Sequence, residues 1–490
     1  MSPETAVETL ALRVQVSAFA GTTLPADYAD LLRAGLGGIC LFGTNTAAGE
    51  QSVRSLSAEI RAASAEGGWT PVITIDEEGG DVTRLEALTG SSVLGAAALG
   101  AADDLALTEE TGRAVGVRLA RAGINLDLAP VADVNSNPDN PVIATRSFSH
   151  DAGVVAKHVA AWVKGLESTG VAACVKHFPG HGDTGQDSHV ALPVLDADLA
   201  TLRNRELVPF LAAAEAGAAS VMTSHIVVPA LDPELPGTLS APVLGLLREL
   251  GYEGPIVSDA LDMAGASEPR GIPAAAVLSL EAGADLLILG PDKPTSLVHE
   301  TTAAIVAAVE AGELALERLQ DAVARVDRLL ADLDAARQRT DGELDPRFEE
   351  RSVEGARRAL AAASDLTGIP DLAGAEVVTV DTEANIAVGD VPWGLPPDLV
   401  VRPGDPLPDL PDAPLIVQVR DAHRRPEVGR TVAELRGAAV LVEWGWPGTY
   451  DGAGVPRLCP QGYSLPGVAA VTEVLRRAGW DPSTSSGHRK

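Results

Sequence analysis

The segment from Lys176 to His189 holds a dense set of side chains that could move protons. Its sequence, KHFPGHGDTGQDSH, contains one of the five lysines and three of the nine histidines of the chain, together with two aspartates. It follows an apolar stretch typical of a buried strand. Because catalytic groups are often carried on loops, we expect a site that handles protons on a polar ligand. The alternative is a surface loop whose polar groups satisfy one another.

This segment cannot form one continuous helix. Pro179 lacks a backbone N–H and clashes with the preceding turn, and the three glycines cost backbone entropy. His177 and His181 are therefore not a pair on one helical face, as a metalloprotease site would require. Asp187 and His189 are two residues apart, so their side chains point the same way in extended backbone. This spacing predicts a carboxylate that orients an imidazole, which can then act as a general acid or base near neutral pH.

The composition argues against several classes of partner and site. The formal net charge is −31, from 37 basic and 68 acidic residues, so neither nucleic acid nor an anionic membrane surface is expected as a partner. The three cysteines, Cys40, Cys174 and Cys459, lie far apart, which predicts small buried hydrophobic residues and not a disulfide framework or a zinc site. No apolar stretch reaches the roughly 18 residues of a membrane span, and no signal-peptide pattern opens the chain. We therefore expect a soluble cytoplasmic protein.

Short apolar runs alternate with helical patterns through the first part of the chain. Most of these runs are apolar on both faces, as parallel strands covered by helices should be. The expected strands are Val14–Phe19, Gly38–Phe42, Pro71–Asp76, Ile124–Pro130, Ala172–Phe178, Ser220–His225, Pro255–Asp259 and Asp285–Leu289. Eight strands that alternate with helices predict a (β/α)8 barrel over residues 1–336. An open doubly wound sheet is less favoured, because no glycine-rich dinucleotide fingerprint follows an early strand.

Polar residues stand at the carboxyl ends of several of these expected strands. They are Asp76, Asp133, Lys176 with His177, His225 and Asp259. Barrel enzymes build their active sites at this end of the strands, so we expect these side chains to share one site.

A second α/β domain is expected after the barrel. The polar segment 337–350 is typical of a linker. Beyond it, residues 351–481 contain strand-like runs at 377–380, 415–419 and 439–443 and helical patterns at 352–362 and 468–477. We expect this part to form a smaller α/β sandwich domain, and the tail 482–490 to be disordered.

Four segments together resemble the bacterial beta-N-acetylglucosaminidases of glycoside hydrolase family 3. In chain order they are IDEEGGDVTRL (75–85), DVNSNPDNPVIATRSF (133–148), KHFPGHGDTGQDSH (176–189) and GYEGPIVSDALDM (251–263). The second half of the chain is similar only in layout and in VEWGWPG (442–448). The resemblance implies a hydrolase that uses neither a metal nor an organic cofactor.

The resemblance also implies roles for individual residues. Asp259 would be the nucleophile that forms a glycosyl-enzyme intermediate, although an aspartate after a strand can also be a helix N-cap. His189 would donate a proton to the leaving group and then take one from water, with Asp187 orienting it. Five residues would bind the sugar: Asp76, Arg84, Arg146, Lys176 and His177. Structural ion pairs are the alternative for the two arginines, and His181 and Asp183 are expected to brace the loop.

The sequence departs from the family pattern at a few positions. Asp81 stands where a basic residue is frequent, Gly185 and Gln186 replace the usual loop residues, and Ala260 follows the expected nucleophile where a second acid is frequent. None of these residues has an assigned chemical role, so the departures bear on the choice of substrate.

The expected reaction is removal of terminal beta-linked N-acetylglucosamine, with retention, from cell-wall or chitin-derived oligosaccharides. The sequence leaves open phosphate as an acceptor, which would give a sugar 1-phosphate. It also leaves open a dual beta-glucosidase activity, for which Glu443 would be the candidate acid. From other classes, His177, His181, Asp183, Asp187 and His189 could hold zinc, or the protein could bind sugar without turnover.

Overall fold

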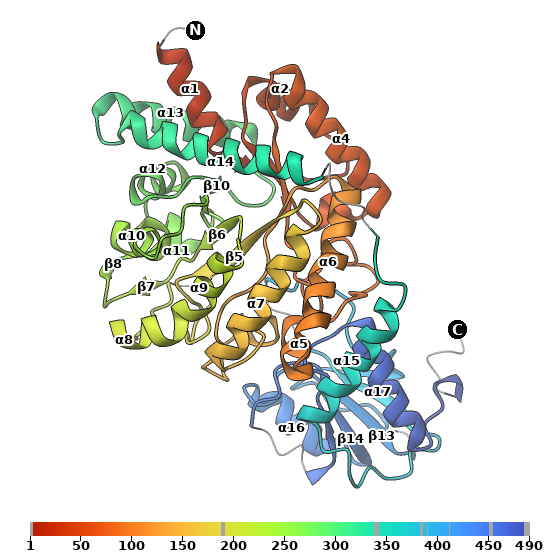
Figure 1. Ribbon diagram of the computed structural model, residues 1–490. Coiled ribbons are helices and arrows are strands. Elements are labelled where there is room, and N and C mark those ends of the chain that lie inside the picture. The colour runs from red at the N-terminus through yellow and green to blue at the C-terminus, as the bar shows by residue number, and fades with distance from the viewer. Residues whose placement is uncertain are drawn as a thin grey trace. The chain divides into compact units, whose positions relative to one another are not determined.

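The computed structural model describes residues 3–187, 192–337, 343–382, 386–389, 391–410, 412–449 and 454–484. The chain forms two compact units (Figure 1). The first unit comprises Met1–Glu77, Thr108–Val134 and Asp151–Leu344, and the second comprises Glu78–Leu107, Asn135–His150 and Asp345–Lys490. The sequence led us to expect two domains that are each one continuous stretch, 1–336 and 351–481, joined by a linker at 337–350. The compact units are interleaved, because two segments between barrel elements belong with the second unit.

Eight parallel strands of the first unit form a barrel in the order β10-β1-β2-β3-β4-β5-β6-β9. The strands are β1 (Gln15–Ser17), β2 (Gly38–Leu41), β3 (Val72–Ile75), β4 (Leu126–Asp127), β5 (Ala172–Phe178), β6 (Ser220–Thr223), β9 (Ile256–Val257) and β10 (Leu287–Ile288). The two ends of this order meet, because Val257 forms a parallel bridge with Leu286. The Ser258 N–H donates to the Leu286 carbonyl at 2.8 Å. All eight expected strands are present, and the predicted (β/α)8 barrel is confirmed.

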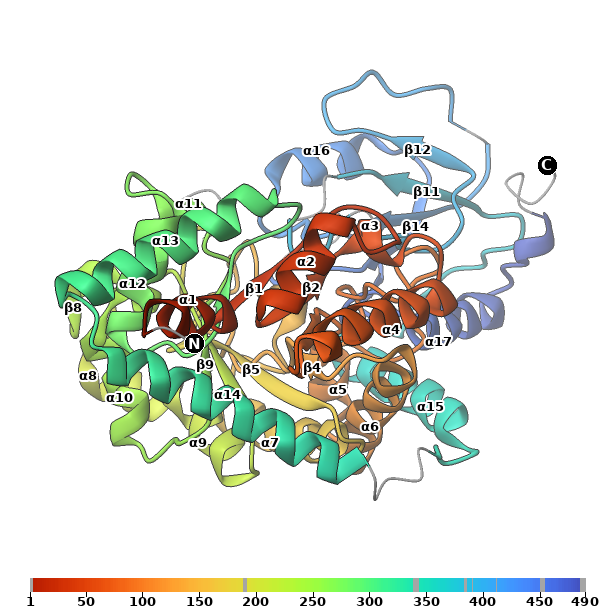
Figure 2. The same ribbon diagram turned by 90° about the horizontal axis from the view of Figure 1, so that it is seen from above.

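Helices surround these strands (Figures 1 and 2). The longer helices of this unit are α1 (Pro3–Arg13), α2 (Ala26–Ala34), α4 (Glu50–Glu66), α6 (Leu105–Ala122), α7 (Ala152–Glu167), α9 (Leu207–Glu215), α10 (Ala241–Glu249), α12 (Ile272–Ala282), α13 (Thr295–Ala311) and α14 (Leu316–Arg337). A short antiparallel hairpin of β7 (Val227–Val228) and β8 (Asp232–Pro236) follows β6. Among the described residues, none of the helices is long and apolar enough to cross a membrane.

The barrel interior is one apolar core. It contains buried residues from every strand, such as Val16, Val72 and Met222, and four residues of α14. Cys40 and Cys174 belong to this core, and Cys459 is also buried, as expected for small hydrophobic residues. Burial of this apolar surface is the main force that holds the strands in a ring.

A buried carboxylate reinforces the junction between β9 and β10. Asp285 is fully buried, and its Oδ2 accepts the Ile256 N–H at 2.9 Å and the Arg248 Nη2 at 2.7 Å. Its Oδ1 pairs with Arg318 of α14. Burial raises the pKa of Asp285, and the two arginines oppose that rise. The pairing lets a charged group remain in the interior.

The second unit contains a five-stranded parallel sheet in the order β12-β11-β13-β14-β15. Its strands are β11 (Glu376–Val380), β12 (Leu399–Val401), β13 (Leu415–Val419), β14 (Ala438–Glu443) and β15 (Arg457–Leu458). Helix α16 (Pro426–Glu434) packs with the face that carries Val378, Val417 and Leu441. Helices α15 (Phe348–Ala363) and α17 (Leu465–Arg477) lie on the other face (Figure 1). The predicted α/β sandwich is confirmed.

Segments from the first half of the chain complete this unit. Helix α5 (Ala96–Ala102) and the short 3-10 helix Ala144–Arg146 belong to it. Gly355 of α15 lies so close to Leu107 that a Cβ there would be 2.3 Å from its Cδ2. Helix α15 therefore packs tightly on residues that precede it by some 250 positions.

Several elements of the second unit were not predicted. Strands β12 and β15 are only 3 and 2 residues long, too short for a periodic pattern to stand out. Helix α16 was missed, although its Pro426 occupies the first turn as helix starts allow. In the expected linker, α14 runs to Arg337 and α15 starts at Phe348, while 338–342 lie outside the described residues. In the expected tail, Pro482–Thr484 form a short 3-10 helix and 485–490 lie outside the described residues.

Glu167, the last residue of α7, provides a test of the packing between α7 and the barrel. Its Oε1 accepts the N–H groups of Ala219 at 2.7 Å and Ala173 at 3.3 Å, and burial raises its pKa to about 7. The folded state thus binds a proton more tightly than the unfolded state, whose glutamate titrates near 4.5. The free energy of unfolding should therefore fall as pH rises from about 4.5 through 7.

We expect Glu167→Gln, which keeps an oxygen for both N–H groups, to remove this part of the pH dependence. The thermal midpoint of the variant should drop less between pH 5 and pH 8 than that of the unaltered protein. These two pH values lie on either side of the pKa of Glu167, which is about 7. Glu249→Gln, at an exposed position of α10, is the matched control. An equal drop in all three proteins would contradict the assignment.

Candidate active site

Lys176 and Asp76 form an ion pair at the carboxyl ends of β5 and β3. The Lys176 side chain is 2% exposed, and its Nζ lies 2.7 Å from Asp76 Oδ1. Strand β4 lies between these two strands, so the lysine reaches across it. A lysine this deeply buried requires an anionic partner. The structure therefore brings together two of the predicted sugar-binding residues.

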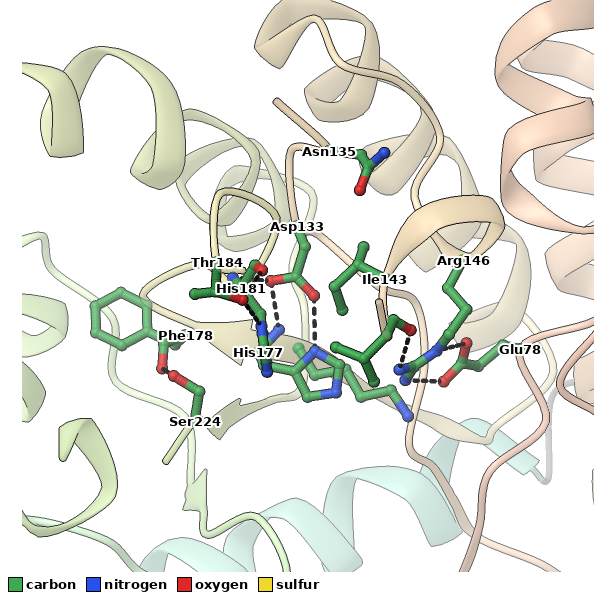
Figure 3. Close-up of polar contacts among 12 residues, drawn as sticks. Glu78, Asp133, Asn135, Ile143, Arg146, His177, Phe178, His181, Thr184 and Ser224 are labelled. Carbon is green, nitrogen blue, oxygen red and sulfur yellow. Dashed lines mark hydrogen bonds and ion pairs between the residues drawn. The ribbon is translucent and has the colours of Figure 1, made fainter. Parts of the chain in front are cut away.

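The carboxylate of Asp133 binds two histidine residues at once (Figure 3). Its Oδ2 lies 2.7 Å from His177 Nδ1, and its Oδ1 accepts the backbone N–H groups of His177 at 3.2 Å and His181 at 2.7 Å. Asp133 is fully buried and His177 is 7% exposed. Because a carboxylate only accepts, His177 donates its Nδ1–H, which directs Nε2 away from Asp133. Asp133 thus fixes both the ring of His177 and the start of the loop.

The charge of Asp133 is stabilised by these contacts. Burial alone would raise the pKa of this carboxyl, but the His177 side chain and the hydrogen bonds outweigh burial and lower the pKa. Asp133 was expected only as one of several polar strand ends. Its position as a shared acceptor depends on two loops meeting, which sequence spacing does not reveal.

The rest of the loop is braced by local contacts. His181 Nδ1 lies 2.7 Å from the Thr184 hydroxyl, and Asp183 pairs with Arg205 at 2.5 Å. These contacts agree with the bracing role expected for His181 and Asp183. Asp187 is partly exposed, whereas His189 lies outside the described residues, so their predicted pairing stays a prediction.

Asp259 follows β9 at the same end of the barrel and is partly exposed. Its backbone N–H points to the Thr223 hydroxyl at 3.3 Å, and its Oδ1 accepts the Ala260 N–H at 2.7 Å. Strands β5, β6 and β9 are neighbours in the sheet. The expected nucleophile therefore follows a strand that is adjacent to β6 and two strands from β5, which carries Lys176.

Arg146 and Arg84 belong to the second unit and have partners there. Arg146 donates from Nε and Nη2 to the two oxygens of Glu78 at 2.9 and 2.8 Å (Figure 3). Arg84 donates from Nη2 to the Ala387 carbonyl at 2.8 Å. Arg146 thus makes a structural ion pair, the alternative that the sequence left open, whereas Arg84 bonds a backbone carbonyl. Their roles in sugar binding stay predictions.

Glu443 of the second unit has a structural role. Glu443 is fully buried and accepts the backbone N–H groups of Asp421, Ala422 and Gly445 at 2.7 to 3.0 Å. Burial raises its pKa to about 7. A carboxylate held by three backbone donors fixes a loop, which disfavours Glu443 as a catalytic acid.

Asp81, one of the departures from the family pattern, also links segments of this unit. It accepts the Thr145 hydroxyl at 2.7 Å and the Tyr463 N–H at 3.0 Å. It therefore joins three separate stretches of the second unit. Among the described residues, no group of three or more His, Cys, Asp or Glu side chains is placed to hold a metal ion.

Comparison with known proteins assigns the family. The glycosyl hydrolase family 3 N-terminal domain model matches residues 14–329. The chain belongs to glycosyl hydrolase family 3. The predictions of this family and of a glycosidase are confirmed.

The most informative relatives cover different parts of the chain. A Beta-hexosaminidase of Stenotrophomonas maltophilia (strain K279a) is 37% identical over 61% of this chain and 92% of its own length. Beta-hexosaminidase A of Pseudoalteromonas piscicida is 37% identical over 63% of this chain, and the match spans 55% of that protein. A structure of a glycoside hydrolase family 3 beta-N-acetylglucosaminidase from Paenibacillus sp. str. FPU-7 matches with a TM-score of 0.85 at 29% identity and covers 96% of both chains. Both units of this chain therefore have counterparts in a solved structure.

Asp133→Asn tests the hydrogen bonds at the centre of the site. The amide keeps one oxygen for the two N–H groups but offers an N–H₂ to His177 Nδ1, so the imidazole must change from the Nδ1–H to the Nε2–H tautomer. We expect nitrogen NMR at alkaline pH to show that change. Loss of a charged acceptor should also lower the free energy of unfolding by about 1–3 kcal/mol in urea.

The exposed Asp196→Asn is the control for the change of charge. It should leave both measurements unaltered. An unchanged His177 tautomer in Asp133→Asn would contradict the hydrogen-bond pattern.

Proposed function

We propose that this protein is a retaining beta-N-acetylglucosaminidase. The observation that carries the proposal is the set of polar strand ends on one barrel, namely the Lys176–Asp76 pair, His177 on Asp133, and Asp259, in a family 3 chain. The relatives named beta-hexosaminidase and the solved beta-N-acetylglucosaminidase support the choice of sugar. The proposed substrates are cell-wall or chitin-derived oligosaccharides that end in beta-linked N-acetylglucosamine.

The proposed mechanism has two displacements at the anomeric carbon. The Asp259 carboxylate attacks that carbon while the bond to the leaving oxygen breaks, and His189 gives its proton to that oxygen. A water molecule then attacks the same carbon, His189 takes its proton, and Asp259 leaves. Two inversions at one centre retain the beta configuration. Asp187 orients His189, so the acid and base are an imidazole and not a second carboxylic acid.

Sugar recognition is proposed for residues of two kinds. Asp76 offers acceptors and Lys176 offers donors at the carboxyl ends of barrel strands, and His177, whose Nδ1–H is given to Asp133, presents its Nε2, which suits the hydroxyl groups of a sugar. Arg84 and Arg146 are retained as proposed sugar-binding residues on the family motifs alone.

We propose water as the acceptor. The relatives support hydrolysis, and phosphorolysis is not favoured. A role in the recycling of cell-wall fragments and a cytoplasmic location are part of the proposal, and no cofactor is needed for the two displacements.

Asp259→Ala is expected to abolish turnover of an aryl beta-N-acetylglucosaminide. Azide should restore turnover of this variant and give the alpha-glycosyl azide, because a small anion then takes the place of the carboxylate. Proton NMR of the first sugar released by the unaltered enzyme should show the beta anomer, and millimolar phosphate should not change the product. Release of the alpha anomer first would exclude the double displacement.

His189→Ala is expected to slow poor leaving groups more than activated ones, because an activated phenol needs little protonation. We expect a loss of roughly 10²–10⁴-fold in kcat/KM for the poorest leaving group. Glu443→Ala, measured in parallel, should retain the leaving-group dependence of the unaltered enzyme. Equal losses across all leaving groups for His189→Ala would refute its role as the acid.

A further inference from the structure

Three buried side chains connect the backbone of Asp259 and Ala260 through a continuous series of four hydrogen bonds. The Asp259 N–H donates to Thr223 Oγ1 at 3.3 Å, and Thr223 Oγ1 lies 2.7 Å from Thr238 Oγ1. Thr238 Oγ1 lies 2.8 Å from His225 Nδ1, and His225 Nε2 lies 2.9 Å from the Ala260 carbonyl. The series therefore starts and ends on two consecutive residues, and we name it the Asp259 ring.

The end groups of the Asp259 ring determine the direction of its hydrogen bonds. A backbone N–H only donates, so Thr223 accepts from Asp259; a carbonyl only accepts, so Nε2 of His225 donates to Ala260. In neutral imidazole the other nitrogen accepts, and the Thr238 hydroxyl is its donor. Thr223 then donates to Thr238. In this arrangement each hydroxyl donates once and accepts once, which requires the Nε2–H form of His225.

The members of the Asp259 ring come from separate elements. Thr223 ends β6, Thr238 lies on the 3-10 helix Gly237–Leu239, and His225 lies between β6 and β7. The side chains of Thr223, His225 and Thr238 are fully buried. Buried polar networks with complete hydrogen bonding are rigid, since each lost bond leaves an unsatisfied group.

The Asp259 ring controls the backbone that orients the carboxylate. Asp259 Oδ1 accepts the N–H of Ala260 at 2.7 Å, while His225 holds the carbonyl of the same residue. The ring thus holds the peptide before Asp259 through its N–H and the peptide after Ala260 through its carbonyl, and so restrains the backbone at both ends of the two-residue segment that carries the carboxylate. Displacement of a reacting group by about 1 Å can cost roughly 10²-fold in rate.

We propose that His225, Thr238 and Thr223 are positioning residues that hold the Asp259 carboxylate in line with the anomeric carbon. This inference rests on the proposed function, because it takes Asp259 as the nucleophile. None of the three residues is assigned a contact with the sugar. Their effect is on the transition state, and binding of the sugar should be nearly unaffected.

Thr238→Val tests the proposal by removing the central hydroxyl at nearly constant volume. We expect kcat/KM for an aryl beta-N-acetylglucosaminide to fall by roughly 10- to 100-fold. The inhibition constant of N-acetylglucosamine should change by less than about twofold, because only transition-state stabilisation is lost. Thr238→Ser, which restores the hydroxyl, should return kcat/KM to within about threefold of the unaltered enzyme.

Thr302→Val is the matched control for the loss of a buried hydroxyl. Thr302 lies on α13, and its hydroxyl accepts a hydrogen bond from Gln15 Nε2 and donates one to the Val298 carbonyl. Because these bonds are not part of the Asp259 ring, the variant should lose stability without loss of kcat/KM. If Thr238→Val does not fold, the pair Thr223→Val and Thr223→Ser applies the same test from the other hydroxyl.

The outcomes separate this inference from the proposed function. If Asp259→Ala is inactive and Thr238→Val keeps kcat/KM within about twofold, the Asp259 ring has no positioning role and the inference is overturned. Full activity of Asp259→Ala would overturn the proposed function itself. A loss in Thr238→Val that Thr238→Ser does not reverse would also count against the ring, because the hydroxyl would not be the group that matters.

Discussion

The junction of β9 with β10 is the constraint on which the site depends. It connects the first and last strands of an eight-stranded sheet and so closes the sheet into a ring. Because the strands are parallel, all their carboxyl ends lie at one end of the barrel. Lys176, Asp133 and Asp259 are far apart in sequence and come from different strands or the loops after them. Parallel strands in a closed ring bring such residues to one rim without any need for local sequence contact. Asp285 and its two arginines reinforce this junction at the start of β10.

The buried charged groups of both units follow a simple rule. Each buried ionic group described above has an oppositely charged or hydrogen-bonded partner: Lys176 has Asp76, and Asp133 has His177 and two backbone N–H groups. In a chain of net charge −31 a lone cation would readily find a carboxylate, whereas buried carboxylates need donors. Asp133, Glu443 and Asp285 all obtain backbone N–H donors. Backbone amides thus supply much of the stabilisation that basic side chains are too few to provide.

The sequence predicted the barrel well because its strands are apolar on both faces and recur at regular intervals. The predicted span Ala172–Phe178 coincides with β5, and the other strands were placed within a few residues. Prediction failed where elements are short, as for β15, and where the partner is distant. Glu78 as the partner of Arg146, Asp133 as a shared acceptor and the Asp259 ring all depend on loops that meet only in the folded chain. Residue types at strand ends indicate which groups are available, but tertiary structure decides which of them touch.

The interleaving of the two units has a consequence for how this chain can be shortened. Residues 78–107 lie before most of the barrel in sequence, yet in the second unit they pack with α15 and accept a hydrogen bond from the first residue of α17. A protein cut after residue 344 would keep α5 and Leu107 but lose the helix that covers them, and would expose their apolar side chains to water. The linker in the sequence therefore does not coincide with the boundary between the two compact units. A barrel that stands alone would need polar replacements in 78–107 and 135–150, so dissection at the linker is a poor route to an independent catalytic fragment.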